Sequence, residues 1–320
     1  MAYYICVDAG GSKCQAILFD ENFRLLGEGI AGGVNTNTTT PEDCRKNVAR
    51  CLELLFASCT PARVERAYIT FVGPRNVFME QLEQCVEIGE YRRLGEGETG
   101  IYAGSVRKSG LVALSGTGSD VFYVVDGKNI AMVGGWGPIL GDDGSGSWIG
   151  QRAIRAVVRA HDGWDEHTAL EELIANAWSL ERGWDMVGLV YQSPSPFRKV
   201  ASLAPIVCEA AATGDRVATG ILAEAGRLLA RQMVSLIRRN EIPRSLWHVT
   251  CCGSVWKGNP VMLRAFVDSL GSFGYPCEVE RSRFEPILAG VAQLILESGA
   301  EPDSARSVME ERFAKYAIRI

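Results

Sequence analysis

The sequence has little of what marks a nucleic-acid-binding or membrane protein. No run of Lys or Arg exceeds two of its 320 residues, and the formal net charge is −5. The positive surface that a nucleic acid or an anionic membrane requires is therefore missing. No apolar run reaches the roughly 18 residues expected of a membrane span, and the start, MAYYICVDAGG, lacks the basic and apolar regions of a secretory signal. We expect a cytoplasmic protein whose partners include neither nucleic acid nor membrane.

Metal-binding and redox patterns are equally sparse. The chain has three histidines without metal-ligand spacing, and none of its ten cysteines forms a C-x-x-C pair. Most cysteines lie in apolar patterns, where a free thiol behaves as a small hydrophobe, so buried and reduced side chains are the favoured interpretation. The adjacent pair Cys251 and Cys252 leaves a redox-active alternative open. The spacings do not support an iron–sulfur site.

What is present is the pattern of an α/β protein with about two domains. Residues 3–10, 13–20 and 24–32 predict three antiparallel strands, and 40–59 a helix with Thr40 as N-cap. Further strands are expected at 66–73, 110–119, 120–127, 129–135, 245–254 and 277–281. Further helices are expected at 78–89, 148–160, 168–179, 199–240, 259–270, 284–298 and 303–316.

The beginnings of two segments resemble each other. Residues 3–33 run strand, DAGGS, strand, turn, strand and GG, and residues 111–135 run strand, SGTGS, strand, turn, strand and GG. Any β-meander has a similar order, but the shared glycine–serine turn at the same place favours duplicated lobes.

The turn DAGGSK, from Asp8 to Lys13, has the residues of a phosphate site. Its two glycines allow close approach of the backbone to a ligand, and successive N–H groups in such a turn form an anion-binding concavity. Ser12 and Lys13 add a hydroxyl and a positive charge, and Asp8 is suited to a hydrated Mg²⁺ beside the phosphates. The segment is neither a P-loop nor a dinucleotide-binding fingerprint, and an ordinary turn is the alternative.

Two further strand ends carry glycine and serine. SGTGS, at 115–119, repeats the first design without a carboxylate, so the two turns together would hold a polyphosphate. CCGSVWKGNP, at 251–260, precedes a helix for which Asn259 or Gly258 is the expected cap and Pro260 the first residue. Taken alone, this third junction is equally well explained as a simple strand–helix connection.

A fourth stretch, GGWGPILGDDGSGSWIG at 134–150, combines many glycines with two aspartates and two tryptophans. In this order, DAGGSK, SGTGS, this stretch and CCGSVWKG resemble the N-acetylglucosamine kinase/BadF-BadG-BcrA-BcrD ATPase family over nearly the whole chain. The resemblance implies an α/β fold of two duplicated actin-like (ribonuclease H-like) lobes with a nucleotide cleft between them. We place the lobes at 1–107 and 108–320, with the last helix able to pack back on the first lobe.

The resemblance also implies roles for individual residues. Those expected to bind ATP are Gly10, Gly11, Ser12, Lys13, Gly116, Thr117, Gly118, Gly253, Ser254 and Trp256. Those expected near the sugar are Asn35, for which Asn37 is an alternative, and Trp136, Gly137, Asp142 and Asp143. Asp8 is expected to act in catalysis on the metal side. The cofactors implied are ATP and Mg²⁺, and the family often pairs as homodimers.

One departure from the family concerns the general base. The kinases of the family carry an aspartate shortly before the second phosphate strand, and strict spacing puts Gly97 at that point. The nearest carboxylates are Glu98, which we take as the catalytic base, and Glu96. Solvated loop acids are the alternative interpretation of both.

The sequence therefore predicts an ATP-dependent kinase of N-acetylglucosamine or a related amino sugar or hexose, with a role in carbohydrate metabolism. The alternatives are a BadF-type ATPase that couples hydrolysis to a partner protein, and a catalytically weak nucleotide or sugar sensor. No cysteine motif matches the cluster ligand of the activator branch, which speaks against the ATPase.

Overall fold

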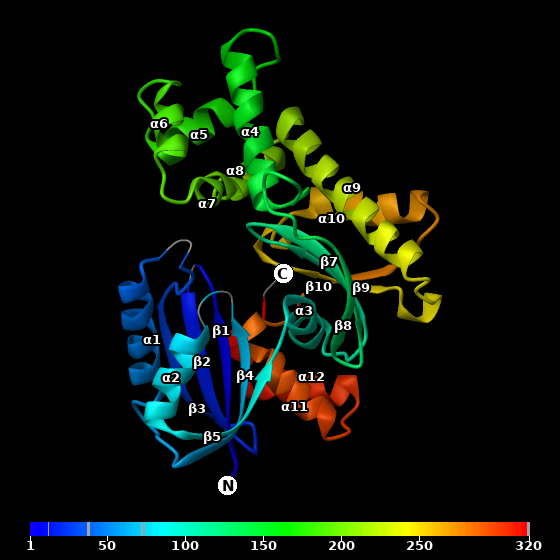
Figure 1. Ribbon diagram of the computed structural model, residues 1–320. Coiled ribbons are helices and arrows are strands. Elements are labelled where there is room, and N and C mark those ends of the chain that lie inside the picture. Colours follow the sequence, from blue (N-terminus) through cyan, green and yellow to red (C-terminus); the bar gives the residue numbers. More distant parts are fainter. Residues whose placement is uncertain (12, 37–38, 72, 74, 319–320) are drawn as a thin grey trace. The chain divides into compact units, whose positions relative to one another are not determined.

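The computed structural model describes residues 1–11, 13–36, 39–71, 73 and 75–318 (Figure 1). Its internal contacts divide the chain into two compact units. The first unit comprises Met1–Ser109, Val124–Asn129 and the described chain from Ser282 onward. The second comprises Gly110–Tyr123 and Ile130–Arg281.

The first unit is built on a five-stranded sheet of order β3-β2-β1-β4-β5. Its strands are β1 (Tyr3–Ala9), β2 (Lys13–Asp20), β3 (Leu25–Gly32), β4 (Arg63–Phe71) and β5 (Glu87–Arg93). The first three form the predicted antiparallel meander, and β4 and β5 run parallel to β1. We did not predict β5, because most of its side chains are exposed and charged and an edge strand of this kind lacks an apolar pattern.

Helices pack on the sheet of the first unit. They are α1 (Pro41–Leu55), α2 (Arg75–Cys85), α3 (Glu96–Ser105), α11 (Ala289–Glu297) and α12 (Pro302–Arg312), with short turns η3 (Pro286–Leu288) and η4 (Ala314–Tyr316). The predicted cap of α1 is confirmed, because the Thr40 hydroxyl accepts from the Asp43 N–H at 3.1 Å. The helix ends at Leu55 rather than at residue 59.

Strand alternation assigns β1 side chains to opposite faces of this sheet. Ile5 and Val7 belong to the core that includes Val48 of α1. Cys6 lies on the other face, where a Cβ added to Gly290 of α11 would be 2.6 Å from its sulfur. Because side chains alternate along a strand, Asp8 shares the face of Cys6.

The C-terminal part of the chain departs from the predicted lobe division. The predicted second lobe runs from 108 to 320, with the last helix able to pack back on the first lobe; the described chain from Ser282 onward, which includes α11 as well as α12, belongs to the first compact unit. The physical reason is that α11 packs against α3, β1 and β4, all of which belong to the first unit. The predicted change of lobe at 107/108 lies near the first change of unit, at 109/110.

The second unit repeats the strand order of the first. Its five-stranded sheet has the order β10-β9-β6-β7-β8, which is the first order read from the opposite edge. The strands are β6 (Gly110–Ser115), β7 (Ser119–Val125), β8 (Lys128–Gly134), β9 (His248–Cys252) and β10 (Glu278–Arg281). As β4 does with β1, β9 pairs in parallel with β6, so the α/β fold and its repeated plan agree with the prediction.

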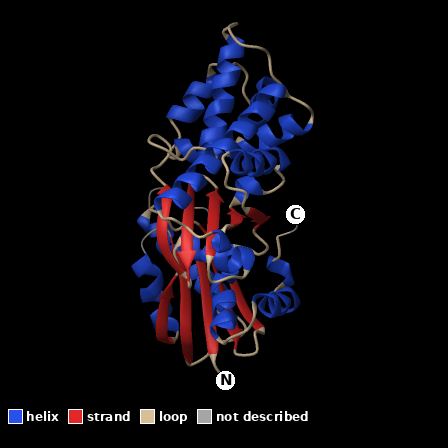
Figure 2. Cartoon of the chain, turned by 90° about the vertical axis from the view of Figure 1, so that its right-hand side faces the viewer, coloured by secondary structure: helices blue, strands red, loops and turns tan. Residues whose placement is uncertain are grey.

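Between β8 and β9 the chain forms helices only (Figure 2, upper blue region). They are α4 (Gly146–His161), α5 (Leu170–Trp178), α6 (Asp185–Tyr191), α7 (Pro196–Ala201), α8 (Ala204–Ala212), α9 (Arg216–Arg239) and the short 3-10 helix η1 (Arg244–Leu246). The single helix expected at 199–240 is thus divided, because Gly214 has a φ of 94° and Asp215 caps α9 through Ala218 N–H. After β9 come the turn η2 (Ser254–Trp256) and α10 (Pro260–Ser272), whose expected cap Asn259 is confirmed.

Two further expectations concern burial and membranes. All ten cysteines are free, and Cys251 and Cys252 are both buried. Among the described residues, no helix is long and apolar enough to cross a membrane.

Candidate functional site

The first glycine turn joins β1 to β2 in the first unit. Gly10 N–H donates to the Lys13 carbonyl at 2.9 Å, which closes the turn. The Gly10 carbonyl accepts from Val34 N–H at 2.8 Å. The turn is therefore fixed both internally and to the segment after β3. Ser12, a predicted ATP ligand, lies outside the described residues.

A charged pair lies at this turn. Lys13 Nζ is 3.3 Å from Asp8 Oδ2 and donates to Gln15 Oε1 at 2.6 Å. Burial raises the pKa of the Asp8 carboxyl; Lys13 opposes this shift, and the nearby Glu285 adds to it. The carboxylate thus lies in a poorly solvated position where a cation would stabilise it.

Asn35, the predicted sugar ligand, is held close to the same turn. It follows Val34, whose N–H bonds the turn, and its own carbonyl accepts from Thr39 N–H at 2.9 Å. Gly73 has a φ of 140°, and a Cβ there would be 3.2 Å from Asn35 Cα. This close approach of two backbones requires glycine. The alternative, Asn37, lies outside the described residues.

The two candidate bases lie on a helix rather than in a loop. Gly95, the N-cap of α3, has no side chain, so only the Glu98 half of a capping box is present, with Oε2 accepting from Gly95 N–H at 2.6 Å. Its Oε1 accepts a longer bond of 3.3 Å from Asn129 N–H. Glu96, at the first helical position, is exposed. Glu98 therefore stabilises the start of α3, independently of the predicted role as general base.

The start of α3 is attached to the sheet near Asp8. Asp8 of β1 pairs in register with Thr70 of β4, and the Thr70 and Thr99 hydroxyls are hydrogen-bonded at 2.9 Å. Asp8, the glycine turn and the N-terminal end of α3 therefore lie at the C-terminal ends of β1 and β4.

The second glycine turn, between β6 and β7, is surrounded by the glycine-rich stretch 134–150. Ser115 Oγ donates to the Gly144 carbonyl at 2.8 Å, and Ser119 Oγ donates to the Asp143 carbonyl at 2.9 Å. Both serine side chains are buried. Hydrogen bonds from hydroxyls to backbone carbonyls thus join this turn to the stretch.

Helix α4 fixes the orientation of the peptide planes in this turn. Gly146 N–H donates to the Gly116 carbonyl at 2.8 Å. The Thr117 carbonyl accepts from the Ser147 N–H at 3.2 Å and from the Ser147 hydroxyl at 2.7 Å. In a planar trans peptide the N–H points opposite to the C=O. The N–H groups of Thr117 and Gly118 therefore point away from α4.

Asp142 forms part of the framework of the stretch. It is only 6% exposed, and its Oδ1 accepts from Gly137 N–H at 3.1 Å. Burial raises the pKa of Asp142, while hydrogen bonds from Gly137 N–H and Ser119 N–H oppose the shift and Asp143 adds to it. Trp136, by contrast, is 72% exposed. Asp142 thus links the second turn to the loop that carries Trp136.

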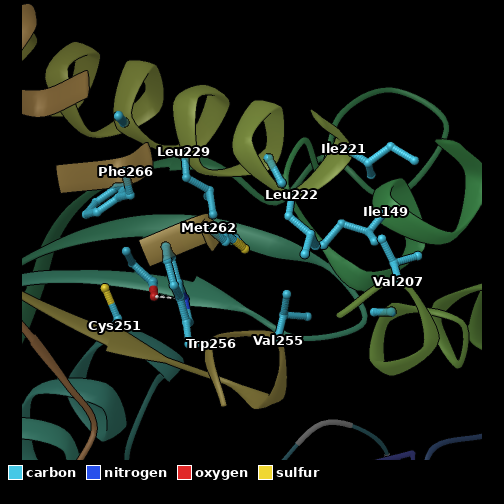
Figure 3. Close-up of a cluster of buried hydrophobic side chains, with 14 of the residues drawn as sticks. Ile149, Val207, Ile221, Leu222, Leu229, Cys251, Val255, Trp256, Met262 and Phe266 are labelled. Atoms are coloured by element: carbon cyan, nitrogen blue, oxygen red, sulfur yellow. Dashed lines mark hydrogen bonds between the residues drawn. The ribbon is translucent and has the colours of Figure 1, made fainter. Parts of the chain in front are cut away.

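At the third junction, between β9 and α10, Gly253 lies against the second turn and Trp256 lies in the core. Gly253 has a φ of 103°, and a Cβ there would be 2.2 Å from the Ser115 carbonyl. Trp256 is 1% exposed; its indole N–H donates to the Ala113 carbonyl at 3.0 Å and its ring packs edge-on against Phe266 (Figure 3). This corrects the expectation that Trp256 contacts ATP, because its one donor is used inside the core.

A cavity of about 380 Å³ lies at these elements within the second unit. Predicted residues on its wall are Gly116, Thr117 and Ser254, joined by Gly146 at the start of α4. Val255 and Lys257 of the predicted third junction also line it, whereas the sequence did not indicate the rest of the lining, which is Arg198, Ala201, Ser202, Ala204, Pro205 and Cys208. Pro205, in the first turn of α8, was the available signal for a break in the helix expected at 199–240.

A larger cavity of about 600 Å³ lies elsewhere in the second unit, along α4, α5 and α6. Its lining includes Val157, Met186 and Trp184 but none of the predicted site residues. Of these two cavities, the smaller is the one that coincides with the second glycine turn and the third junction.

Comparison with known proteins decides the family. The model of the BadF/BadG/BcrA/BcrD ATPase family matches residues 5–283. The chain belongs to the BadF/BadG/BcrA/BcrD ATPase family. An N-acetyl-D-glucosamine kinase of Dictyostelium discoideum is 32% identical over 257 residues, 74% of this chain and 79% of that protein. An N-acetylmuramic acid/N-acetylglucosamine kinase of Clostridium acetobutylicum is 27% identical over 262 residues, 80% of this chain and 86% of that protein.

Several solved structures have a fold similar to that of this BadF/BadG/BcrA/BcrD family member. A structure from Porphyromonas gingivalis, described as a proposed N-acetylglucosamine kinase, has a TM-score of 0.71 at 17% identity, covering 94% of this chain and 100% of that one. A glucokinase from Streptomyces griseus, solved with glucose and AMPPNP, has a TM-score of 0.54 at 15% identity, covering 96% of this chain and 100% of that one. At these identities the likeness concerns the fold alone.

Proposed function

We propose that this protein is an ATP-dependent kinase that phosphorylates a hydroxyl of N-acetylglucosamine or a related amino sugar. The observation that carries the proposal is the cavity of about 380 Å³ whose wall includes Gly116, Thr117 and the start of α4. The N–H groups of Thr117 and Gly118, which point away from α4, are the donors suited to phosphate oxygens, because the first N–H groups of α4 are already bonded to Gly116, Thr117 and Ser145. The names of the two curated relatives supply the substrate class.

The remaining lining of the cavity fits a nucleotide. Arg198 and Lys257 bring positive charge, and Val255 and Pro205 bring apolar surface suited to a base. In the first unit, Gly10, Gly11, Ser12 and Lys13 are the proposed second set of phosphate ligands.

Asp8 is the proposed residue on the metal side, and its environment fits Mg²⁺. Mg²⁺ is usually held by one or two carboxylates together with phosphates and waters, and Asp8 is a poorly solvated carboxylate beside the turn. Among the described residues, no group of three or more His, Cys, Asp or Glu side chains could form a metal site. When bound, Mg²⁺ would neutralise charge on the transferred phosphoryl group.

Glu98 is the proposed general base, and Asn35, Trp136, Gly137, Asp142 and Asp143 are the proposed surroundings of the sugar. The sugar hydroxyl oxygen forms the new bond to phosphorus, ADP leaves, and Glu98 takes the hydroxyl proton. The weak bond at Oε1 of Glu98 leaves that oxygen the better acceptor. We also propose that the protein acts in the cytoplasm and forms a homodimer.

The activity test incubates the protein with Mg·ATP and a panel of hexoses and N-acetylhexosamines, and measures sugar phosphate. We expect sugar-dependent ADP release, greatest with an amino sugar. ADP release without dependence on sugar would instead indicate the coupled ATPase, and ATP binding without turnover a sensor.

Glu98→Gln tests the base separately from the helix cap. Glutamine can also form a capping box, so α3 should persist while the proton acceptor is lost. We expect kcat to fall by roughly 100-fold or more with an unchanged circular dichroism spectrum. Glu96→Gln is the matched control and should retain most of the activity; the reverse result would assign the role to Glu96.

A further inference from the structure

A continuous set of polar contacts lies behind the first glycine turn, within the first unit. It begins at Lys13, whose Nζ donates to Gln15 Oε1 at 2.6 Å. Gln15 Nε2 then donates to Glu28 Oε1 of β3 at 3.2 Å. Glu28 in turn accepts from Tyr316 Oη at 2.7 Å and from Lys315 Nζ at 2.5 Å. The C-terminal segment is thereby linked to the turn.

Gln15 occupies the central position of this set. It lies directly opposite Asp8 in the β1–β2 register and is only 5% exposed. An ionised carboxylate can accept hydrogen bonds but cannot donate them, so Glu28 requires the amide nitrogen of Gln15 to face it. The amide oxygen must then face Lys13. One orientation of the Gln15 amide satisfies both neighbours.

Glu28 is suited to impose that orientation. Burial raises its pKa, but the bonds from Lys315, Tyr316 and Gln15 and the charge of Lys315 outweigh burial, and the pKa lies below its usual value. The carboxylate therefore stays ionised at neutral pH and remains a hydrogen-bond acceptor.

We propose that Gln15 is a positioning residue that places the Lys13 ammonium beside the first turn. Glu28, Lys315 and Tyr316 fix its amide. Without Gln15, the ammonium would be drawn to Asp8 alone, from which it is 3.3 Å away, and it would compete there with a bound cation. The inference rests on the proposed function, in which Lys13 contacts phosphate and Asp8 lies on the metal side.

Gln15→Met tests the proposal against a matched control in the same unit. Gln293 of α11 is also a buried glutamine, 1% exposed, and its Nε2 donates to Glu297 Oε1 at 2.8 Å. Gln293→Met removes a bond of the same kind without touching Lys13. We expect both variants to stay folded, and Gln15→Met alone to raise KM for Mg·ATP by about tenfold with an unchanged KM for sugar.

Equal KM values for Mg·ATP in the two folded variants would overturn the proposal and leave Gln15 a purely structural residue. Tyr316→Phe should also raise KM for Mg·ATP, by roughly threefold.

Equilibrium ATP binding to Lys13→Met distinguishes a failure of the proposed phosphate role of Lys13 from a failure of the positioning role of Gln15. If that variant binds ATP as wild type does, the phosphate role of Lys13 fails; if it binds weakly and Gln15→Met does not, only the positioning role fails.

Discussion

The two glycine turns occupy the same place in sheets of the same strand order, yet they are held by different forces. The first carries Asp8 and Lys13, an ion pair linked to buried polar residues behind it. The second has no charged residue within it; the hydroxyls of Ser115, Ser119 and Ser147 bond backbone carbonyls, and the Asp142 carboxylate behind the turn accepts from the Ser119 N–H.

This difference indicates that electrostatic and geometric roles are divided between the two turns. Charges that are partly removed from water interact strongly with phosphate and cations, so the first turn is suited to electrostatic work on the transferred group. In the second turn, Gly146 and Ser147 bond the carbonyls of Gly116 and Thr117 and leave the N–H groups of Thr117 and Gly118 directed away from α4, so this turn is suited to hold phosphates in a fixed geometry. Three sets of substitutions test this division, from the largest expected effect to the smallest.

Asp8→Asn should have the largest effect. It keeps the shape of the side chain but removes the charge proposed for the metal side. We expect kcat/KM to fall by roughly 100-fold or more, measured as sugar phosphate formed under saturating Mg²⁺.

Asp20 provides the control for that variant. It ends β2 of the same sheet, is fully buried, and accepts from the N–H groups of Asn22 and Arg24. Asp20→Asn should lower the melting temperature and leave KM values near wild type. Full activity in Asp8→Asn would remove the first turn from the proposed site.

Gly116→Ala tests the second turn with a smaller effect. No atom of the protein lies within 4 Å of a Cβ added at Gly116, so the fold should accept alanine. A ligand that approaches this backbone would meet the methyl group, and we expect KM for ATP to rise about tenfold at an unchanged melting temperature.

Gly253→Ala should give the opposite result. The added Cβ would meet the Ser115 carbonyl at 2.2 Å, and φ is 103°, so we expect a loss of roughly 2–3 kcal/mol of stability. Unfolding followed by circular dichroism measures it. If Gly116→Ala binds ATP as wild type does, the backbone of the second turn is not a phosphate site.

The smallest effect concerns the acids behind the two turns, whose contributions to stability should change with pH in opposite directions. The lowered pKa of Glu28 means that its contribution is present above its unfolded pKa and is lost as pH falls. The raised pKa of Asp142 means that its contribution is present below its unfolded pKa and is lost as pH rises through the folded value.

Melting temperatures of Glu28→Gln and Asp142→Asn at about pH 7 and about pH 3.5 measure this contrast. Glu28→Gln should destabilise more at about pH 7, by roughly 1–2 kcal/mol, and Asp142→Asn more at about pH 3.5. The same pH dependence in both variants would contradict the contrast.

Much of the fold followed from local signals. Thr40 and Pro41 predicted the start of α1, and Asn259 and Pro260 the start of α10, because helix caps use a few residue types at fixed positions. The edge strand β5 and the helix α3 escaped prediction. Exposed charges conceal the strand, and the glycines of GEGETG conceal a helix whose start is stabilised by Glu98.

The sequence by itself determined the repeated strand plan, the glycine turns and the family, because these depend on residue type and spacing along the chain. Only the tertiary structure decided that Trp256 lies in the core and that α7 and α8 line the cavity at the second turn. It also decided that residues near 315 contact Glu28 of β3. Such contacts join residues far apart in the chain, and they depend on which faces pack together, which no local pattern records.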